Sequence, residues 1–239
     1  MTVGASARPP RIGVAVPAAG AGRRMGEVRK PWLELLGEPL IVHALRPFLA
    51  DPRVMAVVVA LAEDDALDPP AWLSALDPRV LVVGGGASRS ESVACAVAAL
   101  PDPLDVILVH DAARPLVSAP VIDRVVAAAL DGTGAVAGWP ASDTLKEVDA
   151  DGRIVGTPDR ERIWHAQTPQ GFPAELLRRA LSDADSAGIT DTTDDAALVE
   201  RVGGEVVMVA GSAHNLKVTR PEDLTLAEAL LRNLRGSGA

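Results

Sequence analysis

The sequence predicts an α/β fold: a doubly wound, mostly parallel sheet covered by helices on both faces. Nearly continuous apolar runs, such as residues 57–59 and 106–109, alternate along the chain with amphipathic segments. Such runs are typical of parallel strands buried on both faces. Strand, helix and strand in this order indicate right-handed crossovers within one sheet. We expect strands at residues 12–16, 54–61, 80–83, 105–110 and 135–139.

The remaining elements follow from the same patterns. Amphipathic periodicity predicts helices at residues 40–49, 90–100, 120–130, 173–187 and 194–202. Further strands are expected at 205–210 and 215–218, and residues 168–172 are interpreted as a connecting turn. A last helix should begin at Pro221, because proline favours the first helical position and Glu222 and Asp223 follow it. Residues 235–239 are expected to be a disordered tail, and residues 1–239 to form a single domain.

The alternation stops at residues 143–160, which we call the β-arm. Two short strand-like runs, 144–148 and 154–157, flank Asp151-Gly152, which is a strong hairpin signal. Because an isolated two-stranded hairpin is only marginally stable in water, the β-arm should pack against something. The same arm of a second subunit and the body of its own domain both remain possible partners.

Composition excludes several classes of function. Hydrophobic residues make up 48% of the chain and aromatic residues only 3%, so the core should be aliphatic. A net charge of −9 argues against broad binding of nucleic acid or anionic membranes. The N-terminus lacks the apolar stretch of a signal peptide and no run is long enough to span a bilayer, so we expect a cytoplasmic protein. Cys95, the single cysteine, permits no intramolecular disulfide and should be buried in its apolar surroundings.

The loop at residues 17–30 follows the first strand and indicates a phosphate site. Two of its glycines and three of its cations support this interpretation: Gly20, Gly22, Arg23, Arg24 and Lys30. Glycines let the backbone approach an anion and present its N–H groups to phosphate oxygens. The loop is not a Walker A motif, and Met25 breaks the dinucleotide-binding pattern. A tight turn with solvent-facing arginines is the alternative, but three cations after a strand favour the phosphate site.

Asp111 follows the fourth apolar strand. Ligands of open α/β sheets bind outside the carboxyl ends of the strands, and a carboxylate there suits Mg²⁺. A helix-capping aspartate is the alternative. Arg114 could pair with Asp111 or contact a substrate, and His110 is interpreted as a structural histidine because it has no partner for a catalytic triad.

Two weaker signals come from residues 84–92 and from Lys217. The glycines and hydroxyls of residues 84–92 permit close contact with a base or ribose, although an ordinary loop with a serine cap explains them equally. Lys217 could face solvent from an edge strand, or, if it lies near the first loop, could be a second phosphate clamp.

Five motifs together resemble the 2-C-methyl-D-erythritol 4-phosphate cytidylyltransferase family. They are residues 17–25 (PAAGAGRRM), 110–115 (HDAARP), 143–146 (DTLK), 164–170 (WHAQTPQ) and 215–224 (NLKVTRPEDL). The first motif is shared by many sugar-nucleotide transferases, whereas the second and fifth are much more specific. The resemblance runs from about residue 12 to residue 231, and the stretch from Met25 to Lys30 is one residue shorter than the family pattern.

The resemblance implies a Rossmann-like nucleotidyltransferase that transfers CMP from CTP to 2-C-methyl-D-erythritol 4-phosphate in non-mevalonate isoprenoid synthesis. It implies a CTP site formed by Ala18, Ala19, Gly20, Gly22, Gly86, Ala87 and Ser92. Arg24, Lys30 and Lys217 would act on the phosphates as catalytic residues, and Asp111 would bind Mg²⁺. The acceptor site would use Thr144, Arg160, Thr168 and Thr193, with Arg114 nearby. In the family the arm swaps across a homodimer, which would bring Arg160 into the partner's site.

Two other functions remain open. One is a related cytidylyltransferase for another polyol phosphate, such as ribitol 5-phosphate; Ala113 stands where we expect a bulkier residue in that relative. The other is a nucleotide-binding protein without catalysis, against which the presence of Lys30, Asp111 and Lys217 argues.

Overall fold

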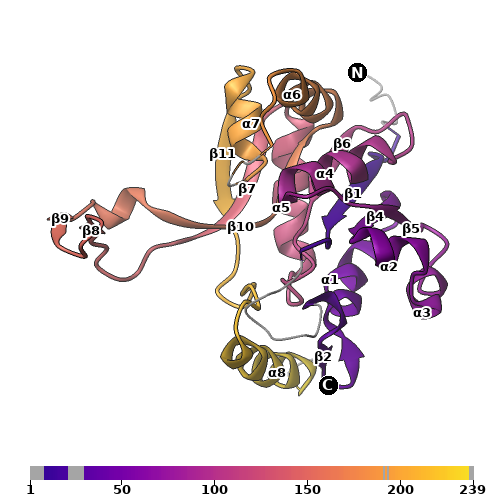
Figure 1. Ribbon diagram of the computed structural model, residues 1–239, viewed down its shortest axis with the longest axis horizontal. Coiled ribbons are helices and arrows are strands. Elements are labelled where there is room, and N and C mark those ends of the chain that lie inside the picture. The colour runs from indigo at the N-terminus through magenta and orange to yellow at the C-terminus, as the bar shows by residue number, and fades with distance from the viewer. Residues whose placement is uncertain (1–7, 21–29, 191, 193, 237–239) are drawn as a thin grey trace, which may run out of the picture.

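The computed structural model describes residues 8–20, 30–190, 192 and 194–236, with Lys30 described by its backbone alone. Seven strands form the central sheet, in the order β11-β7-β10-β6-β1-β4-β5 (Figure 1). These are β1 (Ile12–Pro17), β4 (Val54–Leu61), β5 (Val80–Gly84), β6 (Val106–Val109), β7 (Gly134–Pro140), β10 (Trp164–Pro173) and β11 (Val206–Ala210). All neighbouring pairs are parallel except those of β10, which is antiparallel to both β6 and β7. The predicted doubly wound, mostly parallel fold is confirmed.

Helices cover both faces of this sheet. They are α1 (Leu40–Leu49), α4 (Arg89–Ala98), α5 (Ala119–Leu130), α6 (Ala174–Ser186) and α7 (Ala196–Arg201). One core cluster joins α1 and α5 to strand residues such as Val57 and Val59, and the other joins α4, α6 and α7 to Val58. Successive strand side chains point to opposite faces, so each apolar run supplies both cores. No helix within the described ranges is long and apolar enough to cross a membrane.

The remaining elements are short, apart from the C-terminal helix α8 (Pro221–Gly236). They are η2 (Lys30–Trp32), β2 (Glu34–Leu35), β3 (Glu38–Pro39), α2 (Glu63–Leu67), α3 (Ala71–Ala75), β8 (Glu147–Val148), β9 (Ile154–Gly156) and η3 (Arg160–Arg162). A third small cluster joins Ala227 of α8 to Leu35, Leu116 and Val218. The β8–β9 hairpin of the β-arm extends away from the sheet on two long connections (Figure 1).

Four expectations were wrong. Residues 168–172 are not a turn but lie within β10, where Gly171 leaves room for Val125 and Leu108 against the backbone. Residues 215–218 form no strand, and residues 235 and 236 belong to α8. Cys95 is exposed, because its position on α4 turns it away from the sheet that Val93 and Ala96 cover.

Candidate active site

Two pockets lie along the rim formed by the carboxyl ends of the strands. The first has a volume of about 620 Å³ and is lined by the loops after β1, β4, β5 and β6. Its lining includes the predicted residues Ala18, Ala19, Gly20, Gly86, Ala87, Ser92, Asp111 and Lys217. The second has a volume of about 270 Å³, and its lining includes Arg89, Asp111, Arg114, Thr168, Gln170 and Lys217. Because Arg89, Asp111 and Lys217 line both pockets, the pockets meet at these three side chains.

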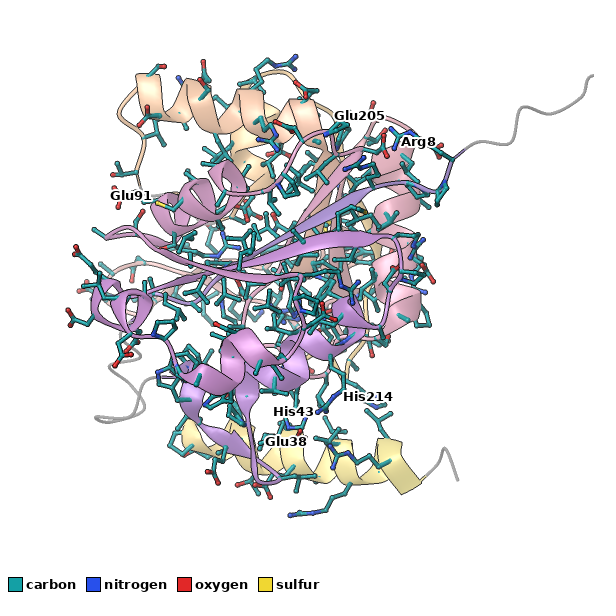
Figure 2. All side chains as sticks on the ribbon, turned by 90° about the vertical axis from the view of Figure 1, so that its right-hand side faces the viewer. Arg8, Glu38, His43, Glu91, Glu205 and His214 are labelled. Carbon is teal, nitrogen blue, oxygen red and sulfur yellow. The ribbon has the colours of Figure 1, made fainter. Side chains whose placement is uncertain are left out.

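The wall of the first pocket is fixed by the start of α4. Ser88 accepts a hydrogen bond from the N–H of Glu91, while the Glu91 carboxylate accepts from the N–H groups of Ala87 and Ser88. This is a capping box, which satisfies helix-terminal donors reciprocally. Glu91, in the first turn of α4, is labelled in Figure 2. A Cβ on Gly85 would lie 2.7 Å from the Cβ of Ala19, so glycine there allows the loops after β1 and β5 to meet.

Charged side chains of the rim cluster around Asp111. Its side chain is only 10% exposed; Oδ1 lies 3.2 Å from Arg89 Nε and Oδ2 lies 2.6 Å from Lys217 Nζ. Burial alone would raise the pKa of this carboxyl, but the charges of Arg89 and Lys217 outweigh burial and hold the pKa well below its ordinary value. Asp111 is therefore a carboxylate at neutral pH, with one cation on each oxygen.

His110 supports the backbone beneath Asp111. Its Nε2 lies 3.1 Å from the carbonyl oxygen of Arg114, to which it must donate, so Nδ1 accepts from the Thr168 hydroxyl at 3.1 Å. The same hydroxyl accepts the N–H of Asp111 at 3.0 Å. Burial lowers the pKa of His110 to about 4, so the ring is neutral at pH 7. These contacts fit the structural role expected of His110.

Arg89 lines both pockets and is held by the buried Asp195, and the sequence revealed neither role. Arg89 Nη2 lies 2.9 Å from Oδ2 of Asp195, whose side chain is fully buried. Gln170 holds the start of α7 by accepting hydrogen bonds from the N–H groups of Asp195 and Ala196, each at 3.1 Å. Arg89 lies in the loop at residues 84–92, but no local sequence pattern there indicates that it pairs with the distant carboxylate of Asp195.

The structure brings some predicted acceptor residues together and separates others. Thr168 and Arg114 line the second pocket, where the Arg114 guanidinium donates to the carbonyl oxygens of Asn215 and Ala166 at 2.8 and 3.1 Å. Thr144 and Arg160 lie on the β-arm and line neither pocket; Arg160 donates to the carbonyl oxygen of Ser142 at 2.9 Å.

Other predicted residues are only partly described or not at all. The predictions for Gly22, Arg24 and Thr193 lie outside the described residues. Lys30 begins η2, beside Pro31 of the first pocket, but its side chain also lies outside the described part of the chain.

The rim offers a Mg²⁺ ion one buried carboxylate. Within the described ranges no group of three or more His, Cys, Asp and Glu side chains could hold a metal. Asp111 supplies the hard oxygen ligands that Mg²⁺ prefers, and Mg²⁺ commonly takes one or two carboxylates together with substrate phosphates and water. The residues present therefore fit a Mg²⁺ ion that arrives with a triphosphate, rather than one held by the protein alone.

Comparison with known proteins places the chain in a family. The model of the family described as 2-C-methyl-D-erythritol 4-phosphate cytidylyltransferase matches residues 12–233. The chain is 44% identical over 234 residues to the enzyme of that name from Acidobacterium capsulatum, covering 93% of this chain and 98% of that one.

Solved structures agree with this assignment. A structure of the same name from Thermus thermophilus is 36% identical with a TM-score of 0.77, covering 92% of this chain and 98% of that chain. The 4-diphosphocytidyl-2C-methyl-D-erythritol synthase of Anaerococcus prevotii is 25% identical with a TM-score of 0.82, covering 94% and 97%. The chain belongs to the 2-C-methyl-D-erythritol 4-phosphate cytidylyltransferase family.

Proposed function

We propose that this protein uses the two joined pockets to transfer CMP from CTP to 2-C-methyl-D-erythritol 4-phosphate, releasing pyrophosphate. The observation that carries the assignment of the pockets is their meeting at Asp111 and Lys217. The larger pocket, lined by the glycine-containing loops, would take CTP. The smaller one, lined by Arg89, Arg114 and Thr168, would take the phosphate of the acceptor.

The reaction needs no general base. A phosphate monoester has a second pKa of about 6, so the acceptor is mostly dianionic at pH 7. One of its oxygens forms a bond to the α-phosphorus of CTP while the bond from that phosphorus to pyrophosphate breaks. His110, which precedes Asp111 in the chain, is neutral and buried and has a hydrogen-bond partner on each ring nitrogen, in keeping with such a mechanism.

The chain's contribution is positioning and charge. Two anions repel each other, so holding them in line and neutralising their charge in the transition state lowers the barrier. Lys217 lies where both pockets meet, so it would contact a phosphate group bound in either pocket. Arg24 and Lys30 would add positive charge from the first loop, and Thr168 would help to hold the acceptor.

Mg²⁺ is part of the proposal, with Asp111 as its protein ligand. When bound, the ion would neutralise charge on the triphosphate. Its binding can be checked without turnover: CTP should bind more tightly with Mg²⁺ than with EDTA in calorimetry. An Asp111→Asn variant should lose most of that difference, and an unchanged difference would contradict the assignment of Asp111.

The proposal also includes a cytoplasmic homodimer in which the β-arm reaches the partner. Thr144 and Arg160 lie on the β-arm and line neither pocket of their own chain, so a partner's rim would give them their acceptor-binding role.

Pyrophosphate release tests the activity. Purified protein with Mg²⁺ and CTP should release pyrophosphate with 2-C-methyl-D-erythritol 4-phosphate and much less with ribitol 5-phosphate. A preference for ribitol 5-phosphate would contradict the proposed acceptor. CTP binding without release with either acceptor would favour a non-catalytic nucleotide-binding protein.

A further inference from the structure

Lys217 is held in place without regular secondary structure around it. Residues 211–220 contain no helix and no strand, yet Lys217 Nζ lies 2.6 Å from Asp111 Oδ2. A lysine side chain is flexible and loses much rotamer freedom when it is fixed. Neighbouring contacts must therefore hold the backbone from which Lys217 projects.

Asn215, two residues before Lys217, is fully buried and anchors this segment to β10. Its Nδ2 donates to the carbonyl oxygen of Thr168 at 2.8 Å and to Oε1 of Gln167 at 3.3 Å. Thr168 in turn holds the N–H of Asp111 through its hydroxyl. One amide side chain thus links the backbone that bears Lys217 to the residue that fixes Asp111.

The side chain of Gln167 also holds this segment, by bonding to both backbone groups of Ser212. Its Nε2 donates to the carbonyl oxygen of Ser212 at 2.8 Å, and its Oε1 accepts the N–H of Ser212 at 3.2 Å. The side chain thus makes the paired bonds that a neighbouring strand would make. A Cβ on Gly211 would overlap Oε1 of Gln167, so glycine there permits this close approach.

The other side of Lys217 is also fixed. The N–H of Val218 donates to the carbonyl oxygen of Ala113 at 2.8 Å, and Arg114 donates to the carbonyl oxygen of Asn215 at 2.8 Å. Within the described residues, Oδ1 of Asn215 is buried without a hydrogen-bond partner. Such an atom costs stability, whereas Nδ2 of the same amide is hydrogen-bonded to β10.

We propose that Asn215 is a positioning residue that holds Lys217 at the junction of the two pockets, with Gln167 as its support. Asn215 lines neither pocket, so it acts through Lys217 rather than on a substrate. The inference rests on the proposed function of Lys217. Since misplacement of a reacting group by about 1 Å can reduce a rate about 10²-fold, loss of the anchor should reduce kcat by about that factor.

A double-mutant cycle tests this role. Asn215→Leu keeps the number and branching of the side-chain heavy atoms and removes the amide, and Lys217→Met removes the charge. With Lys217 present, Asn215→Leu should lower kcat about 10²-fold. In the Lys217→Met background the same change should alter kcat by no more than about twofold, the ordinary scatter of independent sites. Equal losses in both backgrounds, or no loss in either, would overturn the proposal.

A control variant, a substitute variant and a second measurement complete the experiment. His214→Ala changes the exposed residue that precedes Asn215 (labelled in Figure 2) and should leave kcat unchanged. If Asn215→Leu does not fold, Asn215→Asp, which keeps the shape but loses the donor, takes its place in the cycle. If the unsubstituted protein transfers no CMP, the proposed function fails, and the same cycle on the Kd for CTP decides the positioning role: coupling supports it and additivity overturns it.

Discussion

The rim of the sheet and the β-arm both carry predicted substrate-binding residues, but they are built in opposite ways. At the rim, Asp111 is nearly buried, follows a central strand and has a cation on each oxygen. On the β-arm the strands are two and three residues long, and Val148, Ile154 and Val155 are 53%, 63% and 61% exposed. The sheet fixes the rim within one chain, whereas nothing in the described part of the chain covers these apolar side chains of the β-arm.

This difference predicts that CTP binding needs one chain, whereas acceptor binding by the β-arm needs two. Neighbouring exposed apolar side chains often mark a protein–protein contact, and burial of a Val or Ile side chain contributes about 1.5–3 kcal/mol. The rim should therefore bind CTP in a single chain. The β-arm should act on the acceptor only when a partner covers it.

The largest effect is expected at the rim. Lys217→Ala should lower kcat by roughly 10² to 10³, the range seen when one donor to a developing charge is removed. Lys30→Ala should cost a similar factor. Unchanged melting temperatures would show that folding is intact, and near-normal turnover by either variant would contradict the role of that lysine.

The β-arm should show a smaller and more selective effect. Arg160→Ala would remove the proposed charged contact to the acceptor phosphate, so kcat/KM for the acceptor should fall roughly 10- to 10²-fold. The Kd for CTP, measured by calorimetry, should not change. Weaker CTP binding in this variant would contradict the claim that the rim binds CTP without the β-arm.

Mixing two impaired proteins sharpens the same distinction. In a mixed dimer of Lys217→Ala and Arg160→Ala chains, one site would combine an intact rim with an intact partner β-arm. Activity should therefore rise after the two are unfolded together and refolded. Activity equal to the sum of the separate variants would show that each β-arm serves its own chain.

A third effect concerns acid stability of the rim. Burial lowers the pKa of His110 from 6.5 to about 4, so the folded state resists protonation that the unfolded chain accepts. This contribution to the free energy of unfolding is fully present above pH 6.5 and is lost as the pH falls from 6.5 towards 4. At pH 5 the free energy of unfolding should be lower by about 2 kcal/mol.

Urea unfolding at pH 7.5 and pH 5 measures this loss. His110→Gln removes the titrating group, so the free energy of unfolding of this variant should fall less between the two pH values. His43, whose pKa burial also lowers, is present in both proteins and cancels in the comparison. An equal fall in both proteins would show that His110 does not carry the acid sensitivity.

The smallest effect is expected at the cap of α4. Ser88→Ala removes the hydroxyl that accepts from Glu91, which should lower the free energy of unfolding by about 1 kcal/mol. Ser186→Ala, at an exposed position in α6, serves as the control and should change it by no more than about 0.5 kcal/mol. Equal changes in urea unfolding would contradict the role of the capping box in supporting the rim.

The sequence was sufficient for the elements whose patterns are local. The bounds of α1 and β4 match the apolar runs at residues 40–49 and 54–61. Gly20, Gly86 and Asp111 each follow a predicted strand, and strand ends of a parallel sheet share one rim. The three residues line one pocket.

What the sequence did not reveal depends on contacts between distant segments. Strand β10 contains Pro169 and Gly171, which local rules place in turns, but neighbouring strands on both sides hold it in the sheet. The Arg89–Asp195 ion pair and the hydrogen bond from Asn215 to Thr168 join segments far apart in the chain. No local sequence pattern predicts such contacts. Thr144 and Arg160 were identified by family resemblance alone.

The most direct measurement follows an oxygen atom through the reaction. 2-C-methyl-D-erythritol 4-phosphate labelled with ¹⁸O in its phosphate, incubated with CTP, Mg²⁺ and the protein, can be analysed by ³¹P NMR. Attack by the acceptor phosphate on the α-phosphorus predicts ¹⁸O in the bridge of the diphosphate product and none in pyrophosphate. Label in pyrophosphate, or no diphosphate product, would contradict the account.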